Sequence, residues 1–358
     1  MSRRENLFSM YRRTGYQNAE FSFSLCPALV EKYRQAENTA GCDYPSHYDF
    51  TLRDIPQGKI FYPSKSDVIA YYGGKLKDGT VTDIWGVAHE KGSEAAMHMT
   101  RMLHPLENVS DASEVENYPF PDFSHLAEDG AILQAVRSIR ESDHVSIASG
   151  FQCTIWETAW YLRGMEALMI DVMENNDLAH VLFDRITEIS VCRAEKYAGC
   201  GVDILFLGDD IGMQRSIMMS VGLWKEWIFP RLKKVIHTAK NIKPDILIQY
   251  HSCGYIEPFI PYLIEAGVDI LNPVQPECMD FSEIHRKYGD KISFNGTLGT
   301  QTLMPFGSPE EVYSKTQENL RIAGRAGGLL CCPTHLLEPE VPYENVLAYM
   351  QACKEFRP

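Results

Sequence analysis

Short apolar runs alternate along most of the chain with longer segments whose apolar residues recur at helical spacing. The runs are about five residues long and are bounded by Gly, Pro or polar residues, as buried strands are. From Val145 onward they fall at residues 145–149, 202–207, 246–250, 269–271, 292–294 and 329–331. Helical segments follow them, the last at residues 343–356. Strands that alternate with helices predict a parallel sheet.

The amino-terminal part is less regular. After a polar helical stretch, residues 21–25 alternate between apolar and polar, which predicts a first strand. A second strand is expected within residues 29–145, where segments 82–86 and 118–122 have the composition of loops and turns. Eight strands favour an α/β fold of the (β/α)8 TIM-barrel type, in which residues 1–358 form a single domain with an amino-terminal helical and loop elaboration. A doubly wound sheet is the alternative, weakened because no Gly-x-Gly-x-x-Gly fingerprint follows the first strand.

Composition excludes several classes of protein. The chain has 358 residues, 45% of them hydrophobic, which is enough for a large core. Its formal charge of −14 is spread without a basic block, so a nucleic-acid-binding surface is not expected. No apolar stretch reaches the roughly 18 residues of a membrane span, and the first residues lack the apolar core of a signal peptide, so we expect a cytoplasmic protein.

The 10 cysteines are scattered through a long chain, and we interpret them as reduced thiols. Most, such as Cys192 and Cys200, are expected in the core. The exception follows the apolar run at residues 246–250, where His251 and Cys253 are two residues apart and therefore point the same way. An imidazole nitrogen and a thiolate are both zinc ligands, so this pair is a candidate half of a metal site, although a buried Cys is often only a small hydrophobe.

Other polar side chains also follow the predicted strands. Because the carboxyl ends of parallel strands meet at one mouth of a barrel, these side chains are expected to converge there. They are Gln152, Glu157, Asp209, Asp210, Asn272, Gln275, Asn295 and His335.

Longer motifs carry a resemblance to a known family. They are HSCG at residues 251–254, LIEAGVDILNP at 263–273, FNG at 294–296, PFGSPEE at 305–311 and PTHLLEPEVPYEN at 333–345. With them the chain resembles the uroporphyrinogen decarboxylase superfamily from about Tyr118 to its end, and is most similar there to the cobalamin-linked, corrinoid-dependent methyltransferase branch. The resemblance implies one (β/α)8 barrel.

The methyltransferase branch implies a catalytic zinc held by a His-x-Cys pair and a further residue, usually Cys, after the last strand. The pair corresponds to His251 and Cys253, whereas the third position falls on His335. His335 is therefore predicted to replace the thiolate. Two alternatives stay open: Cys331 or Cys332 binds the metal, although one of two adjacent strand residues points into the barrel and the other towards the helices, or no metal binds and the histidines act as acid/base groups.

We expect a methyltransferase that moves a methyl group between a small substrate and a corrinoid carried by a partner protein. Predicted catalytic residues are Asp209, Asp210 and Glu157, with a turn-capping role as the alternative for the aspartates. Predicted substrate-binding residues are Gln152, Trp156, Tyr255, Asn272 and Asn295. Aromatic residues near the strand ends favour a methoxylated aromatic substrate and thus O-demethylation, although Trp156 and Trp160 are also spaced as helix packing partners, and Trp85 lies in an early loop.

Two other functions remain open on the same fold. A porphyrinogen-type decarboxylase would hold a polycarboxylate with arginines, but Arg12 and Arg13 lack the spacing of that branch, and an acidic mouth would repel such a substrate. A non-enzymatic small-molecule binder would be favoured by the absence of zinc. The sequence does not identify the methyl donor or acceptor, the corrinoid partner or the oligomeric state.

Overall fold

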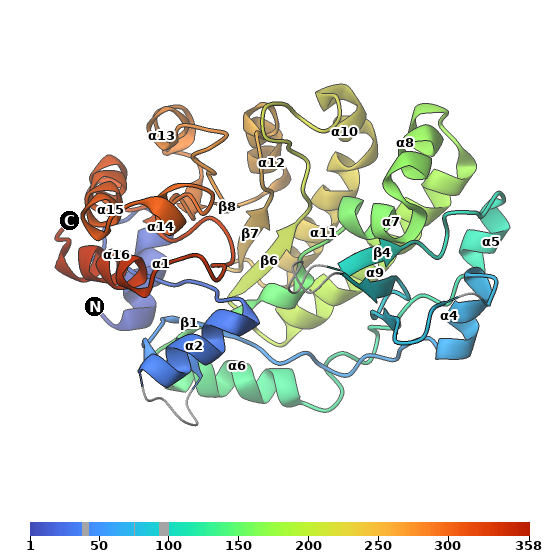
Figure 1. Cartoon of the computed structure of the whole chain (residues 1–358), viewed down its shortest axis with the longest axis horizontal. Coiled ribbons are helices and arrows are strands. Elements are labelled where there is room, and N and C mark those ends of the chain that lie inside the picture. The colour runs from blue at the N-terminus through green and yellow to red at the C-terminus, as the bar shows by residue number, and fades with distance from the viewer. Residues whose placement is uncertain (38–42, 75, 93–99) are drawn as a thin grey trace.

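The structure, a computed structural model, describes residues 1–37, 43–74, 76–92 and 100–358 (Figure 1). A curled sheet lies at its centre, with its strands in the order β1-β5-β6-β7-β8-β9-β10. All neighbouring strands of this sheet are parallel. Their bounds are β1 (Leu52–Asp54), β5 (Val145–Ala148), β6 (Ile204–Gly208), β7 (Leu247–His251), β8 (Ile270–Asn272), β9 (Ser293–Asn295) and β10 (Leu329–Leu330).

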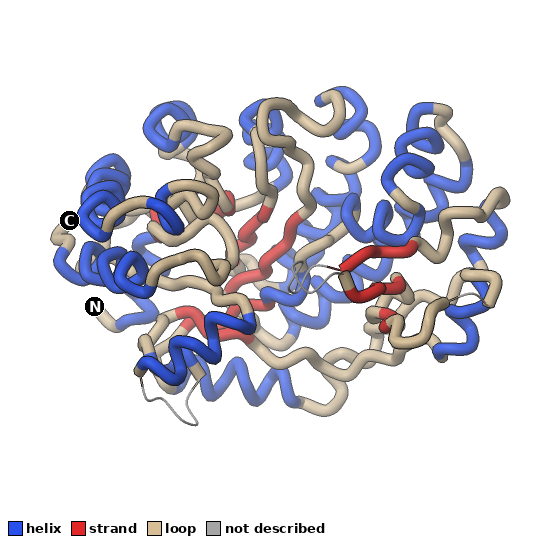
Figure 2. The backbone as a smooth tube through the Cα atoms, viewed as in Figure 1, coloured by secondary structure: helices blue, strands red, loops and turns tan. Residues whose placement is uncertain are grey.

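Helices surround this sheet on its outer side, and both termini lie on the same side of the molecule (Figures 1 and 2). The α/β barrel-type fold predicted from the alternation of strands and helices is confirmed. The helices are α1 (Arg3–Tyr11), α2 (Pro27–Ala36), α3 (Tyr44–His47), α4 (Lys65–Tyr71), α5 (Ala112–Glu116), α6 (Ala131–Glu141), α7 (Trp156–Arg163), α8 (Met165–Met173), α9 (Asp177–Gly199), α10 (Val221–Trp227), α11 (Phe229–Ile242), α12 (Ile260–Ala266), α13 (Phe281–Tyr288), α14 (Leu303–Phe306), α15 (Pro309–Ala323) and α16 (Tyr343–Glu355), with 3-10 turns η2 (Ser149–Phe151) and η3 (Glu257–Phe259).

The first strand predicted from the sequence is reduced to a single bridge between Leu25 and Leu337. This segment lies between the two ends of the sheet, because Leu25 reaches the loop after β10 and Phe23 packs on Phe50, just before β1. Ser22 does not pair with a strand. Its backbone N–H and carbonyl both bond the hydroxyl of Tyr349 on α16, at 3.1 Å each. A side chain thus takes the place of a ladder partner.

A small antiparallel sheet, which the sequence did not predict, lies in the amino-terminal part. It has the order β2-β3-β4 and consists of β2 (Val81–Thr82), β3 (Ala88–Lys91) and β4 (Thr100–Leu103). The second barrel strand also lies there, as β1. It pairs with β5 over only three residues, Leu52 to Asp54. Three residues are too few to show the alternation of apolar and polar positions from which a strand is predicted.

Helix α1 lies near the amino ends of the strands. Arg4 on α1 pairs with the buried carboxylate of Asp203, which directly precedes β6, and Arg13 bonds the hydroxyl of Ser293 at the start of β9. The amino ends are therefore occupied by structural contacts, and the carboxyl ends remain for a binding site. Among the described helices, none is both long and apolar enough to cross a membrane.

Candidate metal centre and active site

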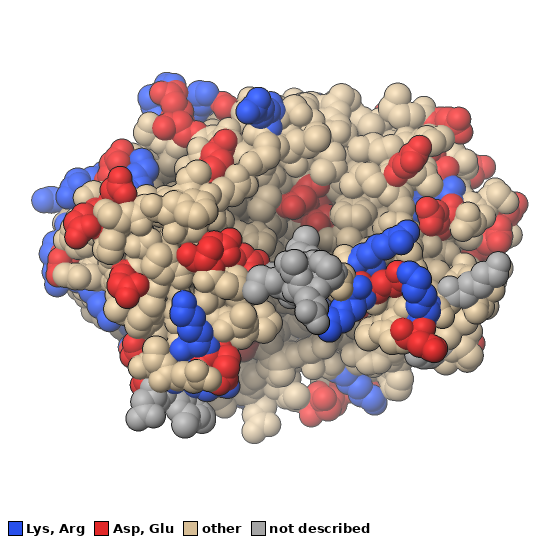
Figure 3. All heavy atoms as spheres, viewed as in Figure 1, with Lys and Arg blue, Asp and Glu red and all other residues tan. Residues whose placement is uncertain are grey.

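A cavity of about 670 Å³ lies at the carboxyl ends of the strands. The space-filling view shows a hollow over the centre of this face, with acidic atoms inside it (Figure 3). Strand ends far apart in sequence contribute to its lining, as the barrel prediction required. They bring together, among others, Asp54, Glu157, Asp210, His251, Asn295 and His335.

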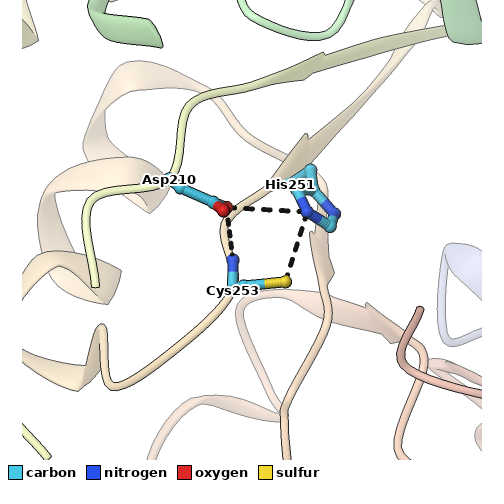
Figure 4. A group of neighbouring side chains, drawn as sticks. All are labelled: Asp210, His251 and Cys253. Carbon is cyan, nitrogen blue, oxygen red and sulfur yellow. Dashed lines mark hydrogen bonds and ion pairs between the residues drawn. The ribbon is translucent and has the colours of Figure 1, made fainter. Parts of the chain in front are cut away.

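Asp210, His251 and Cys253 form the candidate metal centre (Figure 4), and the first two of them line this cavity. One ligand atom of each residue lies within 4.8 Å of the other two. The imidazole Nε2 of His251 is 3.5 Å from the Sγ of Cys253 and 3.6 Å from the Oδ1 of Asp210. The backbone N–H of Cys253 donates to that same Oδ1 at 2.7 Å. Parallel pairing of β6 with β7, which puts Gly208 beside His251, brings the aspartate to the His-x-Cys pair.

A chain of amide side chains fixes the orientation of His251. Asn272 at the end of β8 lies with its Oδ1 2.6 Å from the imidazole Nδ1, and its amide Nδ2 donates to the carbonyl of Asn295 at 2.8 Å. Asn295 in turn donates to the hydroxyl of Tyr11 and to Gln249. Because the amide oxygen accepts at Nδ1, the proton of a neutral imidazole lies there and Nε2 is left as a ligand atom that faces the thiol and carboxylate.

The donor set fits zinc. An imidazole nitrogen, a sulfur and a carboxylate oxygen are its common protein ligands. Burial, with the nearby charges of Asp210 and Glu157, raises the pKa of Cys253. A thiolate at this position therefore needs a compensating cation, which a divalent metal between the three side chains would supply.

His335 lies on the same mouth but outside that group of three. Its ring centroid is 6.5 Å from that of His251, and its side chain is solvent-exposed. Desolvation by surrounding protein and the neighbouring imidazole of His251 lower the pKa of His335, which favours the neutral form that a metal ligand requires. The structure thus brings a carboxylate, Asp210, closer to the His-x-Cys pair than the histidine predicted as third ligand. His335 as a ligand stays a prediction.

The two cysteines that offered the alternative third ligand are buried on opposite sides of the chain. The Sγ of Cys331 is 3.4 Å from the hydroxyl of Thr297 and lies outside the cavity lining, whereas the thiol of Cys332 donates to Asn295 at 3.0 Å at the base of the cavity. Burial raises the pKa of both thiols. Neither belongs to the group of three. Their different contacts agree with the expectation that adjacent residues point in opposite directions.

Asp209 and Asp210 have opposite environments. The carboxylate of Asp209 is fully buried and accepts the backbone N–H groups of Ile155 and Glu157, each at 3.0 Å. It therefore anchors the amino end of α7 and is absent from the described cavity lining. Burial raises the pKa of Asp209 to about 7 although these N–H groups favour its charged form. Its geometry is that of the turn-capping alternative, and only Asp210 faces the cavity.

Glu157 lies on the first turn of α7 and reaches the cavity. Burial and the charges of Asp210 and Asp209 raise its pKa to about 8. The hydroxyl of Tyr161, one helical turn further along, donates to its Oε1 at 2.9 Å. At neutral pH Glu157 therefore carries a proton beside the metal centre.

The polar residues predicted to bind substrate line the cavity, but the aromatic ones do not. Gln152, Asn272 and Asn295 belong to its described lining, whereas Trp156 and Tyr255 do not. Trp156 is 1% exposed and stacks on Phe183 inside the helical layer, because the turn held by Asp209 points its indole away from the mouth. Trp85 and Trp160 are likewise absent from the described lining. The aromatic surface that the cavity does present includes Phe23, Phe50, Tyr161 and Phe206.

Among the lining residues that were not predicted from the sequence, Asp54 and Tyr161 carry groups that can take part in chemistry. Asp54 ends β1 and accepts a hydrogen bond from Ser149, and burial raises its pKa. An acidic residue after a strand is the pattern that identified Asp210, but β1 was too short to locate. Tyr161 could have been found from its spacing of four residues from Glu157, which places both on one helix face.

Comparison with known proteins supports the resemblance. Residues 79–356 match the family model described as uroporphyrinogen decarboxylase (URO-D). A methylated-thiol–coenzyme M methyltransferase of Methanosarcina mazei is 30% identical over 203 residues, which cover 55% of this chain and 50% of that protein. The chain therefore spans about half the length of that relative. A uroporphyrinogen decarboxylase of Pseudomonas fluorescens is 23% identical over 263 residues, 69% of each chain.

A solved structure shares the fold over nearly the full length. It is a methyltransferase from Methanosarcina mazei, with a TM-score of 0.68 and 17% identity over 99% of both chains. The family predicted from the motifs is confirmed, as is the similarity to a methyltransferase within it. The match begins at residue 79, well before the position near Tyr118 where the sequence motifs became clear.

Proposed function

The chain belongs to the uroporphyrinogen decarboxylase family, and from that premise we propose that it is a zinc-dependent methyltransferase acting between a small substrate and a corrinoid. The observation that carries the proposal is the group of Asp210, His251 and Cys253, of which Asp210 and His251 line an open cavity. The similarity to a methylated-thiol–coenzyme M methyltransferase supports it. A corrinoid protein as partner, a cytoplasmic location and a single domain belong to the same proposal.

His251, Cys253 and Asp210 would hold the zinc, and His335 is proposed as a further ligand or as a group that exchanges with substrate. Bound there, zinc would supply Lewis acidity towards a thiol or ether at its open position, and the corrinoid the methyl-carrying cobalt. The chain's own contribution is to hold Nε2 of His251 towards the site through the hydrogen bond between Nδ1 and Asn272.

The substrate we favour is a methoxylated aromatic compound. The ring of Phe206 lies 6.1 Å from that of His251 and offers a flat apolar surface inside the cavity. Glu157, with its raised pKa, would carry a proton at neutral pH and so can donate it to the oxygen that loses its methyl group. A thiol, the kind of compound named for the methyltransferase relative, is the alternative substrate class.

Decarboxylation of a polycarboxylate is disfavoured by the charges around the cavity. Besides the protonated Glu157, its described lining carries the carboxyl groups of Asp43, Asp54 and Asp210 against one guanidinium, that of Arg53. A substrate with many carboxylates would meet like charges.

Zinc content and a methyl-transfer assay test the proposal together. Protein purified without added metal should contain about one zinc per chain. With a reduced corrinoid it should demethylate at least one methoxylated aromatic or methylated thiol, measured by the absorbance of the methylated corrinoid. Zinc with transfer supports the proposal. Zinc-free protein that converts a uroporphyrinogen indicates the decarboxylase, and zinc-free protein without any turnover indicates a binding protein; either result overturns the proposal.

A further inference from the structure

A second cavity of about 430 Å³ adjoins the first. Three consecutive residues of the loop after β10 belong to the lining of both: Thr334, His335 and Leu336. This loop therefore stands as a wall between the two cavities. Of the proposed metal ligands, Asp210 and His251 line the first cavity, Cys253 lines the second, and His335 lines both, so two different molecules can approach the site from the two cavities.

The second cavity is lined by an ordered chain of glutamine amides from three loops. The backbone N–H of Gly254 donates to Oε1 of Gln275 at 3.0 Å, and Nε2 of Gln275 donates to Gln214 at 3.3 Å. Nε2 of Gln214 donates in turn to Oε1 of Gln301 at 2.7 Å. Every bond runs in the same direction, outward from the residue next to Cys253. The chain ends on the side-chain amide of Gln301, an exposed residue of the cavity lining.

Close backbone packing builds the inner wall of this cavity. A Cβ on Gly212 would lie 2.7 Å from the carbonyl of Cys253, and Gly254 has a φ of +85° with the backbone of Gly212 2.7 Å from its own ideal Cβ. The loops after β6 and β7 thus touch through glycines. Their approach holds Gln214 and Gln275 in register for the amide chain.

The charges of the two cavities differ. Apart from Cys253 and His335, the described lining of the second cavity includes a single ionisable residue, Glu338, and no Lys or Arg. Its other polar groups are amides and the hydroxyls of Thr300 and Thr334. Phosphate, sulfonate and carboxylate groups would find no cation there. A neutral ligand with carboxamide groups would find both donors and acceptors.

We propose that the second cavity binds the carboxamide-bearing edge of a corrin. This inference rests on the proposed function, because it assigns the corrinoid, one of the two proposed reactants, to a cavity separate from that of the small substrate. The peripheral side chains of a cobalamin corrin are neutral acetamides and propionamides, which can bond amide to amide with Gln301 and Gln214. A volume of about 430 Å³ takes such side chains and the ring edge, not the whole ring. The small substrate then has the larger, acidic cavity to itself.

Equilibrium dialysis with two corrinoids tests the amide recognition. Dicyanocobinamide carries the side-chain amides and has cyanide on the cobalt, so protein thiols and imidazoles do not bind the metal. Dicyanocobyrinic acid has the same ring with carboxylates in place of the amides. We expect the zinc-loaded protein to bind dicyanocobinamide at least about tenfold more tightly than dicyanocobyrinic acid. Equal affinities, or no binding of dicyanocobinamide, would overturn the proposal.

Variants locate the site. Gln301→Leu and the cavity-filling Thr300→Phe should each weaken dicyanocobinamide binding by about tenfold or more. The matched control is Gln152→Leu, which removes an amide from the first cavity and should leave this affinity within about twofold. Thermal melting identifies any variant that fails to fold, and two independent positions keep the test decisive. If Gln152→Leu weakens binding as much as Gln301→Leu, the corrin binds elsewhere and the assignment is wrong.

The dialysis readout separates this inference from the proposed function. Protein that binds dicyanocobinamide through Gln301 but transfers no methyl group would contradict the methyltransferase proposal. It would still support the corrin-binding site in the second cavity. Protein that transfers methyl groups with a corrinoid, yet binds dicyanocobinamide and dicyanocobyrinic acid equally, would retain the function and lose this site.

Discussion

The ends of β7 and β10 both bring a histidine to the mouth of the barrel, but they hold it differently. His251 is still within its strand, is paired with β8 and is bonded at Nδ1 by Asn272, whose own amide is bonded to Asn295. His335 comes five residues after β10 ends, in a loop, and desolvation together with the nearby His251 lowers its pKa. The β7 end is preorganised for a metal by its strand pairing and by Asn272, whereas the β10 end presents its histidine from a loop. We infer that the first determines metal affinity and the second tunes the open position.

The largest effect is expected at the preorganised end. Cys253→Ala and His251→Ala should each reduce bound zinc from about one per chain to below about one tenth, because each removes a ligand from a site built around three closely spaced donors. Elemental analysis after gel filtration measures this. Cys192→Ala, which removes a thiol from α9, is the matched control and should retain its zinc. A full zinc complement in Cys253→Ala would contradict the assignment.

Removing the support of His251 should have the next largest effect. Asn272→Ala frees Nδ1 and should weaken zinc binding by about 10 to 100-fold, as loss of a residue that orients a metal-binding His does. Competition with a chromophoric chelator gives the affinity. Gln152→Ala, which alters a side chain of the same cavity that does not support His251, should stay within about twofold. If both variants bind zinc equally, the amide chain does not set the affinity.

The β10 end should respond less in affinity and more in turnover. His335→Ala should lower zinc affinity by about tenfold and abolish methyl transfer. His335→Cys should retain the metal, because a thiolate restores a ligand on the same loop. Cys331→Ser and Cys332→Ser should keep their zinc, since both thiols are buried. If Cys332→Ser loses zinc while His335→Ala keeps it, His335 is not the zinc ligand contributed by the β10 end.

The smallest effect concerns stability and pH in the metal-free protein. The pKa of Glu157 rises from roughly 4.3 in an unfolded chain to about 8 in the fold, so the folded state binds its proton more tightly and loses stability as pH increases between those values. Glu157→Gln removes this loss and should raise the Tm above that of the unsubstituted protein by about 2–5 °C at pH 9, with little difference at pH 5. Thermal melts in chelator check it; a difference that does not grow with pH would contradict the raised pKa.

Local pattern was sufficient for much of the fold. From Val145 onward the predicted strands agree with β5 to β10 to within a few residues, because each is an apolar run with its own boundaries and needs no distant partner to be recognised. The shorter elements were not located or not predicted correctly from the sequence. β1 has three residues and is stabilised by pairing with β5, and residues 21–25 lost their ladder to the hydroxyl of Tyr349. That the chain forms one domain stays a prediction.

What the sequence by itself determined about the site is the pair His251 and Cys253, since two residues of one strand end point the same way wherever that strand lies. Only the tertiary structure decided which of the adjacent Asp209 and Asp210 joins them. Both follow β6, but one carboxylate is turned inward to the N–H groups of α7 and the other outward beside His251. Side-chain direction after a strand depends on which neighbouring backbone offers a partner, and that neighbour is brought by the sheet, not by the adjacent sequence.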